Sequence, residues 1–189
     1  MVIKGKHANG TLQNIDMEIL ENPMDWFKKF QDGWMAHLER TGEFNWSQYA
    51  RPRNLLAPSG PGITLSESRI LLISSAGSYL PATQNQFKEN DPTGDYSLRL
   101  IPSNTGFEDI AFAHTHYDHQ YINADPQVLL PLRHLESLAA QGFIGEVAPF
   151  MISYNGYQPN VLRVVKELIP DILDIAKQYQ VRGALLVPA

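Results

Sequence analysis

The residues best suited to chemistry lie close together in this sequence, between positions 114 and 119. His114, His116, Asp118 and His119 follow an apolar run at residues 110–113, a pattern typical of a strand that ends in a polar cluster. Alternation along a strand places His114 and His116 on the same side, while the other two fall where the chain begins to turn. Imidazole titrates near neutral pH and binds metal ions, so the cluster predicts proton transfer or metal ligation. A hydrogen-bonded strand end is the structural alternative.

The six residues 114–119 resemble the H-x-H-x-D-H signature of metallo-β-lactamase-like hydrolases. That resemblance implies that His114, His116, Asp118 and His119 hold zinc, which would activate a water molecule. The surroundings differ from the family pattern, because residues 120–122 are not rich in glycine and the only later histidine lies in a helical pattern. A single, weakly bound ion is still compatible with the cluster.

The first 62 residues predict an N-terminal arm, a helix and a linker that pack on a main domain. Asn22 and Pro23 have the types favoured at the cap and first turn of a helix, and Gly42 has the type that ends one. Apolar residues between them repeat at helical spacing. The face that carries Trp26 and Trp34 is predicted to dock onto a core.

Residues 63–189 predict an α/β domain of three layers, in which helices flank a mostly parallel sheet. The clearest strand is the continuous apolar run at residues 69–77, whose composition indicates burial on both faces. Further elements are predicted as strands at 95–102, 150–154 and 183–189 and as helices at 131–140 and 161–176. The last strand is predicted to be buried, and Pro170 should bend or break the last helix.

Small residues end the first buried strand. Ser74, Ser75 and Gly77 allow backbone N–H groups to approach a ligand closely. Because ligands of open α/β sheets bind beyond the carboxyl ends of strands, this exit and the histidine cluster are predicted to line one crevice. A plain, tight strand exit is the alternative.

The strand at residues 95–102 presents further polar groups. Arg99 is a candidate clamp for a substrate carboxylate, since a guanidinium group binds a carboxylate through two parallel hydrogen bonds. Asp95 and Tyr96 are candidates to orient the substrate or to recognise an ammonium group.

The composition limits the classes of partner. A net charge of −5 on 189 residues gives no basic field of the kind that nucleic acids or anionic membranes require. No secretory leader and no apolar segment of about 20 residues is recognised, which predicts a soluble, cytoplasmic protein. The sequence contains no cysteine, which excludes a disulfide, a zinc-thiolate site and a thiol nucleophile among these residues.

Several short motifs occur in an order that resembles the selenoprotein B subunit family, the reductases of glycine, sarcosine, betaine and D-proline. These motifs lie at residues 72–77, 94–102, 116–119, 131–133 and 142–145. The resemblance implies reductive C–N cleavage of a small amino-acid-like substrate, completed by a partner subunit. It also implies a selenocysteine or cysteine motif soon after the strand at 185–188. The redox residue is therefore expected beyond Ala189, as if a selenocysteine codon had been read as a stop or the chain had been cut before it.

The reductase interpretation requires the tip of the histidine strand and the end of the final strand to meet at the same rim of a single sheet. His114, His116, Asp118 and His119 would then form the polar wall of a substrate pocket, with one imidazole as general acid for the leaving amine. Two other classes stay open. One is a zinc-dependent hydrolase that uses the same four residues, and the other is a non-catalytic subunit that binds a partner or a second copy of itself.

Overall fold

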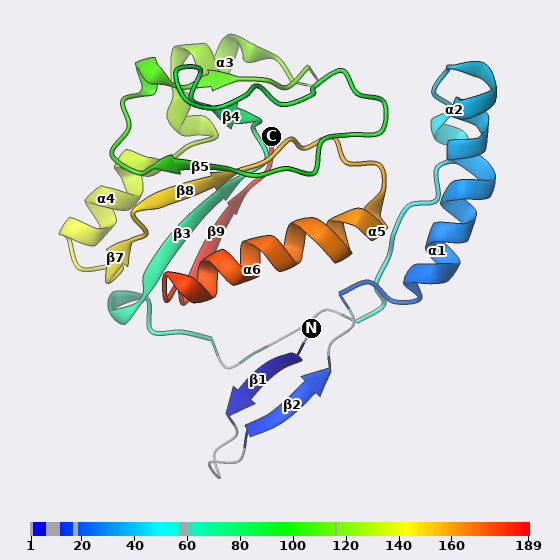
Figure 1. Cartoon of the computed structure of the whole chain (residues 1–189). Coiled ribbons are helices and arrows are strands. Elements are labelled where there is room, and N and C mark those ends of the chain that lie inside the picture. Colours follow the sequence, from blue (N-terminus) through cyan, green and yellow to red (C-terminus); the bar gives the residue numbers. More distant parts are fainter. Residues whose placement is uncertain (1, 7–11, 17–18, 57–59, 61, 116) are drawn as a thin grey trace. The chain divides into compact units, whose positions relative to one another are not determined.

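The structure, a computed structural model, describes residues 2–6, 12–16, 19–56, 60, 62–115 and 117–189 (Figure 1). Its elements are β1 (Val2–Lys6), β2 (Leu12–Asp16), α1 (Pro23–Phe30), η1 (Gln31–Met35), α2 (Ala36–Thr41), η2 (Trp46–Gln48), η3 (Leu65–Glu67), β3 (Arg69–Ser74), β4 (Ser78–Tyr79), β5 (Arg99–Pro102), η4 (Phe107–Asp109), β6 (Ala111–Phe112), α3 (His119–Ala124), η5 (Pro126–Val128), α4 (Leu132–Ala140), β7 (Glu146–Val147), β8 (Phe150–Ser153), α5 (Val161–Arg163), η6 (Val164–Leu168), α6 (Ile169–Gln178) and β9 (Gly183–Val187). They form two compact units, one of residues 1–62 with 160–165 and one of residues 63–159 with 166–189.

The first unit contains the predicted N-terminal helix. The helical stretch starts at Pro23 and runs through α1, the π-turn η1 and α2 to Gly42, which ends it in a left-handed conformation with φ of 72°. Asn22 occupies the N-cap position, but it is also left-handed and its side chain makes no capping hydrogen bond. Trp26 and Trp34 are buried in a cluster of this unit, where aromatic stacking supplies much of the contact.

The second unit is organised around β3, the buried strand predicted from its continuous apolar run. β3 pairs in parallel with β7, β8 and β9, and β5 pairs antiparallel with β8. Ile70 pairs with Val147 of β7 and also with Gly183 of β9, so β9 lies on the side of β3 opposite β7. The mostly parallel sheet predicted for this domain is therefore confirmed.

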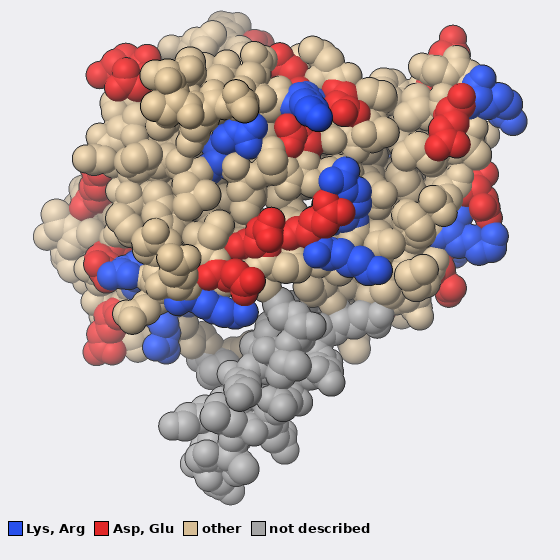
Figure 2. Space-filling model, in the orientation of Figure 1, with Lys and Arg blue, Asp and Glu red and all other residues tan. Residues whose placement is uncertain are grey.

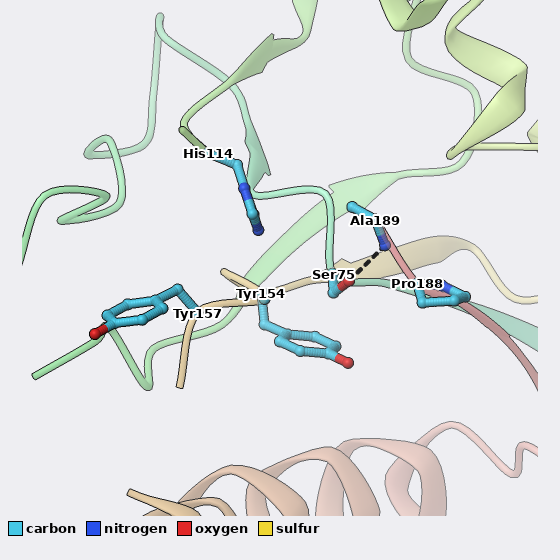
Figure 3. Close-up of a pocket in the computed structure, with 7 residues that line it drawn as sticks. Ser75, His114, Tyr154, Tyr157, Pro188 and Ala189 are labelled. Carbon is cyan, nitrogen blue, oxygen red and sulfur yellow. Dashed lines mark hydrogen bonds between the residues drawn. The ribbon is translucent and has the colours of Figure 1, made fainter. Parts of the chain in front are cut away.

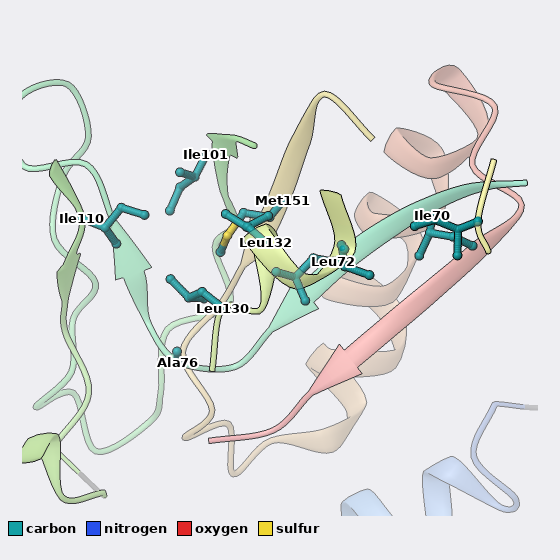
Figure 4. Close-up of a cluster of buried hydrophobic side chains, with 10 residues drawn as sticks. Ile70, Leu72, Ala76, Ile101, Ile110, Leu130, Leu132 and Met151 are labelled. Carbon is teal, nitrogen blue, oxygen red and sulfur yellow. The ribbon is translucent and has the colours of Figure 1, made fainter. Parts of the chain in front are cut away.

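Helices cover both faces of this sheet, as the three-layer prediction requires. On one face, Leu72 of β3 packs with Leu132 and Leu135 of α4 in the cluster of Figure 4. On the other face, Leu71 belongs to a cluster that includes Ile172 of α6. Because successive strand residues point to opposite faces, burial of both neighbours explains why the β3 sequence shows no polar alternation.

Two of the predicted strands differ from expectation, one in its burial and the other in the sheet to which it belongs. β9 is not buried: Leu185 is 39% exposed and Leu186 is 68% exposed, because among the described strands only β3 pairs with β9. The histidine strand is reduced to β6, which pairs antiparallel with β4 in a separate two-stranded sheet. The expectation that this strand belongs to the main sheet was therefore wrong.

Pro170 does not break the last helix. The π-turn η6 directly precedes α6, and Pro170 stands in the first turn of α6. Proline lacks an N–H group and its ring clashes with the carbonyl four residues earlier in an α-helix. A wider turn before the proline relieves that clash, and the chain stays helical through Gln178.

On the face shown in Figure 2, acidic and basic side chains are interspersed, and no large area of one sign is seen. None of the helices within the described ranges combines the length and the apolar character that crossing a bilayer requires.

Candidate functional site

Three parallel strands of the second unit end at the same rim of the sheet. Ser74, the last residue of β3, pairs with Ser153 at the end of β8 and with Val187 at the end of β9. The next backbone groups continue this pairing: the N–H of Ser75 donates to the carbonyl of Val187 at 3.1 Å, and the N–H of Tyr154 donates to that of Ser74 at 3.1 Å. The residues that follow the three strands are therefore held side by side, where open α/β sheets bind ligands.

A pocket of about 370 Å³ lies at this rim (Figure 3). Its lining residues are Ser75 from the β3 exit, Tyr154, Gly156 and Tyr157 from the β8 exit, Pro188 and Ala189 from the β9 exit, and His114. The hydroxyl of Ser75 accepts a hydrogen bond from the N–H of Ala189 at 2.8 Å, so one side chain fixes the β9 exit to the β3 exit. A volume of this size suits a small ligand.

His114 reaches the rim because a turn at Gly77 brings the β6 segment back over the end of β3. Gly77 has φ of 67°, and the N–H of Ala113 donates to its carbonyl at 2.9 Å. The side-chain amide of Asn155, after β8, donates to the carbonyl of Ala113 at 3.0 Å, and its oxygen accepts from the N–H of Tyr157 at 2.9 Å. Asn155 thus ties the histidine segment to the β8 exit, directly before His114.

Asn155 should therefore matter for stability. The side chain is 2% exposed and satisfies two backbone groups, so Asn155→Ala is expected to lower the free energy of unfolding by about 2–4 kcal/mol. Asn123→Ala, at an exposed position of α3, is the matched control and should change it by less than about 0.5 kcal/mol. Denaturant unfolding followed by circular dichroism measures both. A loss as small as that of the control would contradict the bridging role of Asn155.

The side chains that line the pocket combine apolar surface with the polar groups of Ser75, His114 and two tyrosine residues, and they include no Asp, Glu, Lys or Arg. His114 is 4% exposed, and Gly156 leaves open the space beside its imidazole: a Cβ at Gly156 would lie 2.9 Å from Nε2 of His114 and 3.3 Å from Oγ of Ser75. Burial raises the pKa of Tyr154, and a hydrogen bond with Ser75 partly offsets that effect. The Tyr154 hydroxyl therefore stays protonated at neutral pH.

The other members of the histidine cluster have different positions. Asp118 is exposed and caps α3, accepting from the N–H of Gln120 at 2.8 Å. A ring nitrogen of His119 donates to the carbonyl oxygen of His114 at 2.7 Å. His116 lies outside the described residues. Within the described part of the chain, no three His, Cys, Asp or Glu side chains are placed to hold a metal ion, and the zinc-hydrolase interpretation stays a prediction.

The predicted substrate-binding residues are divided between the pocket and other places. Ser75 lines the pocket, whereas Ser74 is fully buried and its hydroxyl accepts from the N–H of Ala76 at 3.3 Å. Gly77 forms the turn that positions the histidine segment.

Asp95, Tyr96 and Arg99 do not line the pocket. Arg99 donates to the carbonyl oxygens of Asn85 and Leu98, and its guanidinium carbon lies 4.2 Å from the ring centroid of Phe87. Asp95 accepts from the backbone N–H of Lys88 and from both the N–H and the hydroxyl of Ser97. Burial opposes ionisation there, but these hydrogen bonds hold the pKa of Asp95 below its usual value.

Four residues after β8 belong to the site and had no functional role in the sequence analysis. Tyr154, Gly156 and Tyr157 line the pocket, and Asn155 supports it. The signal for them is the rule already applied to β3: small and polar residues that follow a buried parallel strand lie at the ligand-binding rim. Residues 154–157 follow β8 in the same way that Ser75 follows β3.

The fold and the pocket define an α/β protein with a pocket at the carboxyl ends of its parallel strands. Comparison with protein families matches residues 43–188 to the family described as glycine/sarcosine/betaine reductase selenoprotein B. This match covers more than half of the chain, and the chain therefore belongs to that family, as the order of its motifs predicted.

One curated relative is D-proline reductase subunit gamma of Acetoanaerobium sticklandii, which is 29% identical over 122 residues. The aligned part is 65% of this chain and 49% of the relative, so the chain spans about half the length of that protein. No solved structure matches the chain.

Proposed function

We propose that the pocket at the rim of the sheet binds a small amino acid for reductive C–N cleavage, as part of a reductase subunit. The observation that carries this proposal is that His114, Ser75 and the end of β9 line one pocket. The resemblance to the selenoprotein B family implies a selenocysteine or cysteine motif soon after a strand such as β9. A redox residue supplied there would stand beside the same pocket.

The residues of this chain would bind and orient the substrate. The nucleophile is not among them, since the chain contains no cysteine; a selenolate or thiolate supplies the attack on the α-carbon in such a reaction. His114 presents Nε2 beside Gly156, where it would hydrogen-bond to the amino group of the substrate. In the zwitterion this group is an ammonium, so Nε2 would accept a hydrogen bond from it. When the selenolate or thiolate forms its bond to the α-carbon, the C–N bond breaks and the nitrogen leaves as a neutral amine.

The size and the polar groups of the pocket suit an amino acid in its zwitterionic form. The ammonium and carboxylate groups of a zwitterion both lose hydration on entry, so polar groups of the lining would replace those hydrogen bonds. The aromatic rings of Tyr154 and Tyr157 offer faces that attract an ammonium group. In this proposal, Asp95, Tyr96 and Arg99 hold the loop before β5 rather than the substrate.

The name of the relative describes it as a subunit. By extension, we propose that this chain also works together with partner subunits. A partner would resolve the adduct formed at the redox residue, as the resemblance to the selenoprotein B family implies. This part of the proposal follows from the family and not from the pocket.

Calorimetric titration of the purified protein with glycine, sarcosine, betaine and D-proline tests the substrate class. At least one is expected to bind with a Kd of about 1 mM or tighter, within the usual range for small substrates. Cyclopentanecarboxylate has the ring and carboxylate of proline but no amino group, and it should bind at least about tenfold more weakly than D-proline if the amino group is recognised. Absence of binding by all four amino acids, or equal binding of the control, would contradict the proposal.

A further inference from the structure

Tyr117 does not line the pocket, yet its contacts join the histidine segment to the main sheet. Its hydroxyl donates to the carbonyl oxygen of Ala76, just after β3, at 3.0 Å. Its ring centroid lies 4.8 Å from that of His114, with 41° between the planes, and 4.7 Å from that of His119, with 23° between the planes. A ring nitrogen of His119 also donates a hydrogen bond to the backbone carbonyl of His114. The side chains of Tyr117 and His119 therefore both contact His114.

We propose that Tyr117 is a positioning residue for His114 and holds its imidazole in the orientation that faces the pocket. The ring limits the tilt of the imidazole, since packed aromatic groups prefer tilted or offset arrangements. The hydroxyl fixes the ring to the β3 exit. The inference rests on the proposed function only in taking His114 as the polar group that meets the substrate.

The Tyr117 hydroxyl is suited to be a permanent anchor. Burial, and to a smaller extent the Glu89 carboxylate, raises the pKa of Tyr117 to about 12. The hydroxyl therefore stays protonated through the neutral range and donates to the carbonyl of Ala76, which can only accept. Ala76 precedes Gly77, whose carbonyl accepts from Ala113. Two hydrogen bonds thus connect the histidine segment to the same turn.

Two variants separate the ring from the hydroxyl. Tyr117→Phe keeps the ring and removes the hydrogen bond, and Tyr117→Leu removes both. Tyr121→Phe is the matched control, because Tyr121 is 69% exposed in α3. The first readout is the NMR signal of the His114 imidazole Cε1–H group, which senses the ring current of Tyr117. The second is the affinity for D-proline.

We expect Tyr117→Phe to shift the His114 signal and to weaken D-proline binding about three- to tenfold, as the loss of one hydrogen bond predicts. Tyr117→Leu should shift the signal further, and Tyr121→Phe should change neither readout. A His114 signal that is unchanged in Tyr117→Phe would overturn the proposal, whether or not the leucine variant folds. If the unmodified protein does not bind D-proline, the proposed function fails, but the His114 signal still decides the positioning role.

Discussion

Replacing Gly77 with alanine is expected to lower the free energy of unfolding by about 2–5 kcal/mol. Its φ of 67° lies in the left-handed region, which costs a residue with a Cβ about 1–2 kcal/mol. A Cβ at this position would also lie 2.5 Å from the carbonyl oxygen of Ala113. That oxygen accepts from the side chain of Asn155, so it cannot move away without weakening a buried hydrogen bond. Relieving such a contact costs about 1–3 kcal/mol more.

Gly142 provides the control for Gly77→Ala. It has φ of 76°, but a Cβ there would meet no atom within 4 Å. Gly142→Ala is therefore expected to cost only the conformational part, about 1–2 kcal/mol. The difference between the two variants in denaturant unfolding measures the close approach of the β3 exit to the histidine segment. Equal losses would show that this approach does not constrain the fold.

Replacing Gly156 with alanine should remove most of the ligand affinity and leave the fold intact. The new methyl group would lie 2.9 Å from Nε2 of His114, too close for a Cβ contact, so the imidazole would have to shift from its present orientation. The methyl group would also approach Ser75 and occupy the space between the two polar groups of the pocket. We expect the affinity for the tightest of the four amino acids to fall at least about tenfold, equivalent to about 1.4 kcal/mol.

Gly60→Ala is the matched control for this variant, since a Cβ at Gly60 would meet no atom within 4 Å. The ligand affinity of Gly60→Ala should equal that of the unmodified protein. Both variants should unfold at nearly the same temperature as the unmodified protein. Calorimetric titration and thermal unfolding measured on the same samples separate the two effects. Normal ligand affinity in a folded Gly156→Ala variant would place the substrate outside this pocket.

The sequence was most informative where a local pattern and the final packing agree. The helix from Pro23 to Gly42 was predicted from its cap types and apolar spacing, and β3 was predicted from a run in which both faces are buried. Ser75 and His114 were also named as candidates, and they line one pocket because both follow strands whose ends are held together. The helix and β3 depend on residues near each other in the chain.

The structure differs from the sequence-based predictions where residues far apart in the chain determine the local environment. β9 has the composition of a buried strand, but whether a strand is central depends on how many neighbours pair with it, and β3 alone does so among the described strands. Arg99 has the chemistry of a carboxylate clamp, yet Asn85 and Leu98 take its donors. The sequence places Asn155 directly after a buried strand, but its bridging role depends on Ala113, which lies far away in the sequence.

A crystal structure of the protein with bound D-proline would show whether the pocket at the rim of the sheet holds the substrate. We expect ligand density at the rim where β3, β8 and β9 end, with the amino group toward Nε2 of His114 and the ligand beside Ser75 and Ala189. Ligand density elsewhere on the molecule, with this pocket empty, would contradict the claim. So would a structure in which the N–H of Ala189 is separated from the hydroxyl of Ser75 and His114 faces away from both.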